Sequence, residues 1–303
     1  MPLPPLKDPV DPRERVLGLA RGIPVTAFLS STLLAINVVQ TASLVVLPVS
    51  RHSFRRFNRW LADTWWGWCV TASKLLNNVQ VHLTGDSIPM RENAIIVANH
   101  QQMPDITFLM VFARTKDRLG DLKWFVKKPI KYVPGVGWGM VFLDCLFVAR
   151  DWAEDQASIH RTFDRIIRDD VPLWLISFSE GTRVTPEKVR RSHDYARKKG
   201  LPTMKHVLLP RTKGFVASVL GLRGHADAVY DVTIGYKQGV PTLWQYVRGF
   251  ANEAHLHVRR YPMATLPQSA EELSTWLMAR FREKDELLEH FYEHGAFPSA
   301  GPA

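Results

Sequence analysis

The residues from Gly22 to Ser50 include no Asp, Glu, Lys or Arg. Such a run strongly limits what the chain can fold into, because a helix of about 20 apolar residues can cross the roughly 30 Å hydrocarbon core of a membrane. Basic residues lie on both sides of the run, so the positive-inside rule does not fix its orientation. Three alternatives stay open: a single span, a helical hairpin dipping into one leaflet, and a buried helix of a soluble protein.

A second segment with membrane character follows directly. Residues 54–77 combine several tryptophans with arginines and a lysine, a pairing typical of helices in the lipid headgroup region. An amphipathic helix whose tryptophans pack on the protein would show the same pattern. We predict a disordered, basic and proline-rich N-terminus (1–21), membrane-anchoring helices (22–78), one catalytic domain (79–295) and a flexible tail (296–303).

The formal net charge of the 303-residue chain is +10, which predicts an anionic partner. Nucleic acid is one such partner, and an anionic membrane surface or a phosphorylated substrate is the other. The sequence carries no zinc-ligand motif and no nucleic-acid recognition signature, so we favour membrane and phosphate and expect no nucleic acid. Cys69 and Cys145 are the only cysteines, which excludes a disulfide framework.

Beyond residue 78, short apolar runs alternate with helical patterns, an order typical of an α/β domain with a mixed sheet. The expected strands are 79–83, 94–98, 122–126, 145–148, 173–178, 206–209, 228–236 and 254–260. The expected helices are 106–114, 153–168, 186–199, 214–222 and 270–290. No repeat or low-complexity linker interrupts this order, so we expect a single domain.

A histidine follows the apolar run Ala94–Ala98, and an aspartate lies five positions after it. His100 would stand at the end of a buried strand, where sites of α/β proteins are usually built. Pro104 favours a turn into the next helix, which could bring the Asp105 carboxylate onto the His100 imidazole. The carboxylate would fix the tautomer and leave the other ring nitrogen free to take a proton from a hydroxyl. A single His–Asp pair is also often structural, so its meaning depends on the blocks that follow.

Three further blocks follow in order. Residues 127–138, continued by 147–150, carry basic residues beside a proline–glycine turn; residues 178–183 read Phe-Ser-Glu-Gly-Thr-Arg; and residues 208–215 read Leu-Leu-Pro-Arg-Thr-Lys-Gly-Phe. Together with the His-x4-Asp block they resemble the glycerolipid acyltransferase family, and within it the 1-acylglycerol-3-phosphate (lysophosphatidate) acyltransferases. The resemblance extends from Gln80 to Pro262 and implies a glycerol-phosphate acyltransferase-like fold, a mixed α/β sheet flanked by helices.

The resemblance also implies roles for individual residues. His100 would be the general base and Asp105 the acid that orients it, and the hydroxyl of the acceptor would itself be the nucleophile. The residues implied in substrate binding are Lys128, Arg150, Glu180, Gly181, Thr182 and Arg183. Among these, Arg183 would grip the acceptor phosphate, whereas Glu180 could instead hold Arg183 by an ion pair. Arg211 and Lys213 either contact phosphate or simply begin the next helix.

The implied reaction moves a fatty acyl group from acyl-CoA to the sn-2 hydroxyl of lysophosphatidic acid, giving phosphatidic acid and CoA. The implied partners are acyl-CoA, lysophosphatidic acid or another lysophospholipid, and the lipid bilayer, with no metal or redox cofactor. The implied location is a membrane, that of the endoplasmic reticulum or alternatively the mitochondrial outer membrane. Two other functions stay open: an acyl-CoA-dependent enzyme that reacylates lysophosphatidylinositol or lysocardiolipin, and a non-catalytic membrane-bound scaffold.

Several further residues are given no role in the site. They are His82, His206, His255 and His257, and the tryptophans Trp124, Trp138 and Trp174. Positions 255 and 257 alternate in a strand pattern and are expected to face solvent. The three tryptophans are expected in the core.

Overall fold

The computed structural model describes residues 3–149 and 151–298. Its centre is a seven-stranded sheet with the order β1-β7-β6-β2-β5-β3-β4. The strands are β1 (Gln80–Gly85), β2 (Ala94–Ala98), β3 (Leu122–Lys127), β4 (Leu146–Val148), β5 (Trp174–Ser177), β6 (Ala228–Gly235) and β7 (Glu253–Pro262). The five strands from β6 to β4 are parallel, β7 runs antiparallel to β6, and β1 is parallel to β7. The predicted mixed sheet is therefore confirmed.

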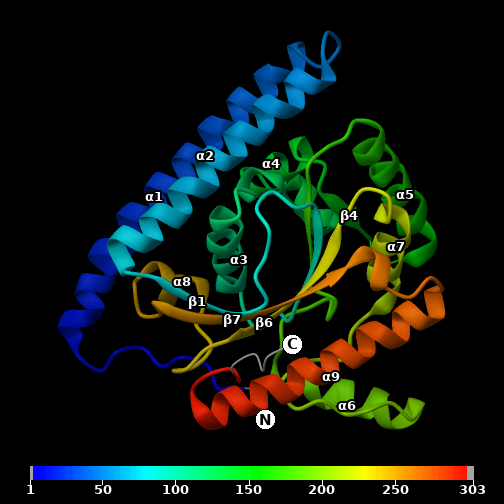
Figure 1. Ribbon diagram of the computed structural model, residues 1–303. Coiled ribbons are helices and arrows are strands. Elements are labelled where there is room, and N and C mark those ends of the chain that lie inside the picture. Colours follow the sequence, from blue (N-terminus) through cyan, green and yellow to red (C-terminus); the bar gives the residue numbers. More distant parts are fainter. Residues whose placement is uncertain (1–2, 150, 299–303) are drawn as a thin grey trace.

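Helices cover both faces of this sheet (Figure 1). They are α1 (Pro12–Ala42), α2 (Arg51–Asn77), α3 (Pro104–Thr115), α4 (Val136–Phe142), α5 (Trp152–Arg168), α6 (Pro186–Lys199), α7 (Thr212–Leu222), α8 (Leu243–Val247) and α9 (Ala270–His294). Apolar residues of α2 and α3 pack on one face of the sheet, and those of α5, α7 and α9 on the other. Because β2 and β5 are buried on both faces, their sequences are continuous apolar runs.

Seven of the eight expected strands form, and the one expected at 206–209 is wrong. That segment has no ladder partner among the described strands. Its amides bind acidic side chains instead: the His206 N–H donates to Asp285 Oδ1 at 2.6 Å, and the Leu208 N–H to Glu180 Oε2 at 3.1 Å. Because its backbone N–H groups already donate to acidic side chains, this segment does not need a neighbouring strand to supply acceptors.

The uncharged run belongs to a helical hairpin. Figure 1 shows α1 and α2 side by side, with their turn projecting beyond the α/β domain. Trp65 Nε1 of α2 donates to the Leu29 carbonyl of α1 at 3.1 Å, and Asn58 Nδ2 donates to Ser43 Oγ at 3.0 Å. The stretch Pro12–Val45 is long and apolar enough to cross a membrane by length and composition.

The hairpin begins earlier than predicted. Residues 12–21 were expected to be disordered, yet α1 starts at Pro12 because Asp11 caps it, its side chain accepting from the Arg13 N–H at 2.8 Å. The preceding residues are also placed, since the Leu6 N–H donates to the Val240 carbonyl at 2.9 Å. Residues 4–6 therefore lie against the loop that follows β6.

Candidate active site

The His-Asp block and the Phe-Ser-Glu-Gly-Thr-Arg block meet at the carboxyl ends of the central strands β2 and β5. β2, β5 and β3 are parallel and in register, with Ala94 opposite Trp174 and Leu122 opposite Trp174. His100, Glu180 and Lys128 therefore all follow the carboxyl ends of neighbouring strands, the edge at which α/β proteins bind ligands.

His100 and Asp105 form the predicted pair. His100 Nδ1 lies 2.9 Å from Asp105 Oδ2, and the same oxygen accepts from the N–H groups of Gln101 (2.7 Å) and Gln102 (2.9 Å). The other carboxylate oxygen, Oδ1, accepts from the hydroxyl of Tyr236. The side chain of Asp105 is fully buried, whereas that of His100 is 12% exposed. The Asp105 carboxylate is thus held by four donors beneath a partly exposed imidazole.

This geometry decides which nitrogen of His100 can act as a base. Asp105 accepts a hydrogen bond from Nδ1–H, so Nε2 carries the free lone pair. The ring stacks on Phe178, with centroids 4.1 Å apart, which holds its plane. Burial and the nearby Asp105 raise the pKa of Tyr236 well above its usual value, so its hydroxyl stays a donor.

Glu180 links the two blocks rather than contacting Arg183. Its Oε1 accepts from the His100 N–H at 2.8 Å, and its Oε2 accepts from the Leu208 N–H. The residue is only 2% exposed, and burial raises the pKa of its carboxyl to about 8, although the two amide donors act in the opposite direction. The ion pair to Arg183 suggested by the sequence is not what holds this side chain.

A second link joins the blocks on the same loop. The Val184 N–H donates to the His100 carbonyl at 2.9 Å, and Arg183 Nη1 donates to Gln102 Oε1. The guanidinium of Arg183 therefore lies beside the His100 loop and is exposed to solvent. Both properties suit a group that grips an anion next to the base.

Gly181 and Arg211 are brought together from separate blocks. Gly181 has φ +69°, and a Cβ there would lie 3.0 Å from Arg211 Cδ and 3.1 Å from its Nε. The Arg211 N–H donates to the Ser179 carbonyl at 2.7 Å. Thr182 Oγ1 accepts from Lys188 Nζ at 2.6 Å, a lysine of α6 that the sequence did not single out. Glycine suits this position because other residues rarely adopt a φ of +69°, and because a Cβ would crowd the arginine side chain.

The remaining predicted site residues are Lys128, Lys213 and Arg150. Lys128 is exposed at the start of the short 3₁₀ helix Lys128–Tyr132 and forms an ion pair with Glu154 of α5. Lys213 lies in the first turn of α7, so the Arg-Thr-Lys segment does begin a helix, as one of the two alternatives proposed. Arg150 lies outside the described residues.

Comparison with known proteins shows the family to which the chain belongs. The sequence profile described as "Acyltransferase" matches residues 79–237, more than half of the chain, and the profile described as "Acyltransferase C-terminus" matches residues 245–302. The chain belongs to the acyltransferase family.

Individual relatives agree. The chain is 32% identical over 289 residues to 1-acyl-sn-glycerol-3-phosphate acyltransferase 3 of Arabidopsis thaliana, covering 91% of this chain and 75% of the relative. It is 36% identical over 270 residues to 1-acyl-sn-glycerol-3-phosphate acyltransferase gamma of Homo sapiens, covering 88% and 72%. For a further Arabidopsis relative, 36% identical over 246 residues, the chain spans 64% of the relative's length. The crystal structure of the 1-acyl-sn-glycerophosphate acyltransferase PlsC from Thermotoga maritima shows a weak likeness, with a TM-score of 0.47 and 17% identity over 86% of this chain and 98% of that one.

A buried ion pair of this acyltransferase supports the strands beneath His100. Lys284 of α9 is fully buried and pairs with Asp231 of β6. Its ammonium also donates to the carbonyls of Val97 (3.2 Å) and Val232 (2.8 Å), near the carboxyl ends of β2 and β6. Local sequence carried no sign of this lysine, since it lies 187 residues from Val97.

We expect Lys284→Met to lower the free energy of unfolding by about 3–5 kcal/mol, because it leaves the Asp231 carboxylate buried without its cation. The matched double variant Lys284→Met with Asp231→Leu removes both charges and should recover most of that loss. Denaturant unfolding of the three proteins measures the difference. Equal losses in the single and double variants would show that the ion pair does not hold this helix on the sheet.

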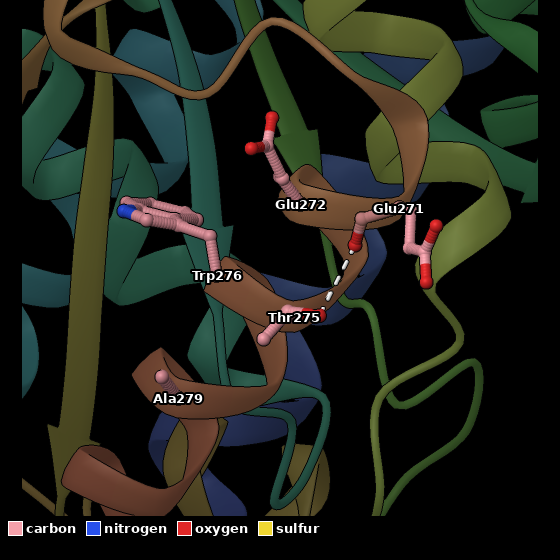
Figure 2. Close-up of a pocket in the computed structure, with 5 residues that line it drawn as sticks. All are labelled: Glu271, Glu272, Thr275, Trp276 and Ala279. Atoms are coloured by element: carbon pink, nitrogen blue, oxygen red, sulfur yellow. Dashed lines mark hydrogen bonds between the residues drawn. The ribbon is translucent and has the colours of Figure 1, made fainter.

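One surface hollow of the described structure lies away from these residues. It has a volume of about 430 Å³ and is lined by Glu271, Glu272, Thr275, Trp276 and Ala279. Figure 2 shows that all five come from α9. A hollow lined by one helix cannot enclose a lipid, so we assign it no role in the reaction.

Proposed function

We propose that this acyltransferase transfers a fatty acyl group from acyl-CoA to the sn-2 hydroxyl of lysophosphatidic acid, giving phosphatidic acid and CoA. The observation that carries the proposal is the His100–Asp105 pair, with one imidazole nitrogen free, beside the exposed guanidinium of Arg183. The names of the relatives, which all describe 1-acyl-sn-glycerol-3-phosphate acyltransferases, support the choice of acceptor.

The reaction follows from the free lone pair on His100 Nε2. This nitrogen takes the proton of the sn-2 hydroxyl as the oxygen attacks the thioester carbon, and Asp105 stabilises the imidazolium that forms. The tetrahedral intermediate then collapses with cleavage of the carbon–sulfur bond. The imidazolium returns its proton to the departing thiolate, which leaves as CoA, and His100 is restored. The chain needs no nucleophilic side chain of its own, because the acceptor supplies the nucleophile.

The phosphate of the acceptor would bind between two arginines. Arg183 lies beside the His100 loop. Arg211 lies against Gly181, which belongs to the same block as Arg183. Both side chains are exposed, and a guanidinium can hold a phosphate by two parallel hydrogen bonds. A phosphate held there would place the glycerol hydroxyls next to the base.

We expect Arg183→Ala to raise KM for lysophosphatidic acid by roughly 10- to 100-fold, the range for loss of hydrogen bonds to a charged group, with a smaller change in kcat. Initial rates at varied acceptor concentration measure it. Arg197→Ala, an exposed arginine near the end of α6, is the matched control and should change neither constant. An unchanged KM in Arg183→Ala would remove this residue from the phosphate site.

The bilayer would meet the hairpin and the adjoining helix. α1 and α4 contact each other, and both helices carry exposed apolar side chains. Those of α1 include Ile23, Phe28, Leu34 and Val38, and those beside or on α4 include Tyr132, Val136, Trp138 and Val141. The expectation that Trp138 lies in the core was wrong, since it is 45% exposed. So large an apolar surface is typical of membrane contact.

Acceptor competition tests the proposal against its nearest rival. The detergent-purified protein would be given oleoyl-CoA with equal amounts of lysophosphatidic acid, lysophosphatidylinositol and lysocardiolipin, and the products separated by mass spectrometry. We expect phosphatidic acid to dominate. Dominance of the inositol or cardiolipin product would keep the chemistry and make this a remodelling enzyme. No product from folded protein would favour a non-catalytic scaffold.

A further inference from the structure

Two histidines and a glutamate converge at the edge of the sheet opposite β4. His82 of β1 and His255 of β7 are register partners. The Nε2 of His82 lies 3.2 Å from Glu253 Oε1, and the Nε2 of His255 lies 2.8 Å from the same oxygen. The two rings are stacked, with centroids 4.5 Å apart. The expectation that His255 and His257 face solvent was wrong: they are 7% and 6% exposed, and His255 packs on Phe291 of α9.

We propose that His82, Glu253 and His255 form a binding site for a divalent zinc ion. One ligand atom from each residue lies within 4.8 Å of the others. Two imidazole nitrogens and one carboxylate oxygen are a ligand set that zinc uses, with water in the fourth position of a tetrahedron, whereas magnesium and calcium prefer oxygen alone. The half-exposed ring of His82 can turn to direct its nitrogen at an ion held by the more rigid His255.

The sheet itself holds the two histidines next to each other. The spacing of the two histidines is fixed by backbone pairing between β1 and β7, so the site does not depend on a flexible loop.

One group competes with the ion. Lys237 Nζ lies 3.0 Å from Glu253 Oε1, the oxygen that both histidines face. Its side chain is exposed enough to swing into solvent when a divalent cation replaces it. The position of the ammonium shows that this oxygen attracts cations, and it predicts that removal of the lysine strengthens zinc binding.

The site lies outside the reaction chemistry but close to a residue that supports it. His255 is opposite Gly235 in the sheet, and the next residue, Tyr236, donates to Asp105. A bound ion would therefore fix the strand end from which Tyr236 reaches the catalytic pair. The inference does not depend on the proposed acyl transfer, because zinc binding can be measured without any lipid.

The test is competition between the purified, untagged protein and a chromophoric zinc chelator, with zinc chloride as the only added metal. We expect one site in the wild type. His82→Ala, on the half-exposed edge strand, should weaken it by roughly 10- to 100-fold or more. Lys237→Gln should bind several-fold more tightly. Thermal unfolding without metal would verify that each variant is folded.

A second histidine pair provides the control. His290 and His294 stack on α9 with centroids 4.1 Å apart, and two histidines four positions apart on a helix can also bind zinc. His290→Ala should leave the affinity unchanged. Loss of binding in His290→Ala but not in His82→Ala would overturn the proposal, as would a wild type that does not take zinc from the chelator.

Discussion

We expect His100→Ala to lower kcat for acylation of lysophosphatidic acid by roughly 10²- to 10⁴-fold, the range that a positioned general base contributes. KM for the acceptor should change little, because the phosphate is held by other residues. The backbone N–H of residue 100 still donates to Glu180 in the variant, so the loop should keep its place. Release of the CoA thiol, followed with a colorimetric thiol reagent, measures the rate.

The control for this variant is His160→Ala, an exposed histidine on α5, which should retain wild-type activity. Unfolding curves of both variants would verify that they are folded. If His100→Ala kept more than a small fraction of the wild-type kcat, the base would have to be another group.

The second large effect is expected at Asp105, where two variants separate orientation from charge. Three donors converge on Oδ2, and a single donor, Tyr236, reaches Oδ1. An asparagine with its oxygen at the Oδ2 position can therefore keep the loop and the tautomer of His100, while it loses the negative charge that stabilises the imidazolium. We expect Asp105→Asn to lower kcat by about 10²-fold or more, with a modest loss of stability.

Asp105→Ala should lower both kcat and the stability of the protein more than Asp105→Asn does. It leaves buried donors without an acceptor, at about 1–3 kcal/mol for each that stays unsatisfied, and it frees the imidazole to turn. Tyr236→Phe is the matched control, because it removes one donor and no charge, and it should cost much less activity. Equal kcat values for wild type and Asp105→Asn would contradict a role for this charge.

The features that could be predicted from sequence are those determined by neighbouring residues. β2 and β5 are covered on both faces, which leaves continuous apolar runs that are easily recognised. His100 and Asp105 are five positions apart, and a proline at the start of α3 turns the chain between them. Their contact therefore followed from local geometry, although the assignment of a reaction also needed the family resemblance.

The features that were missed depend on distant residues. Glu180, Tyr236 and Lys284 reach the His100 region from 80, 131 and 187 residues away. Nothing in the immediate neighbours of Tyr236 and Lys284 marks them, and Glu180 was singled out for substrate binding rather than for its contact with the His100 loop. Glu180 illustrates the difficulty, since in the sequence it is one acidic residue in a polar turn, and only the fold shows that its carboxyl group accepts from two backbone amides.

The way the apolar run meets a membrane could not be predicted from charge. Arginines flank the apolar run on both sides, so one span and a hairpin were equally consistent with the sequence. In the structure most of the run lies in the single helix α1, and α2 packs beside it: Trp65 and Asn58 of α2 donate hydrogen bonds to acceptors in α1 and in the turn.

The most direct test of the proposed reaction is its stoichiometry. The wild-type protein would be incubated with oleoyl-CoA and lysophosphatidic acid, and CoA and phosphatidic acid measured in the same samples over time. We expect the two products to appear in equal amounts, with neither formed when either substrate is omitted. CoA release without phosphatidic acid would show hydrolysis rather than transfer. Absence of both products from folded protein would contradict the proposed activity.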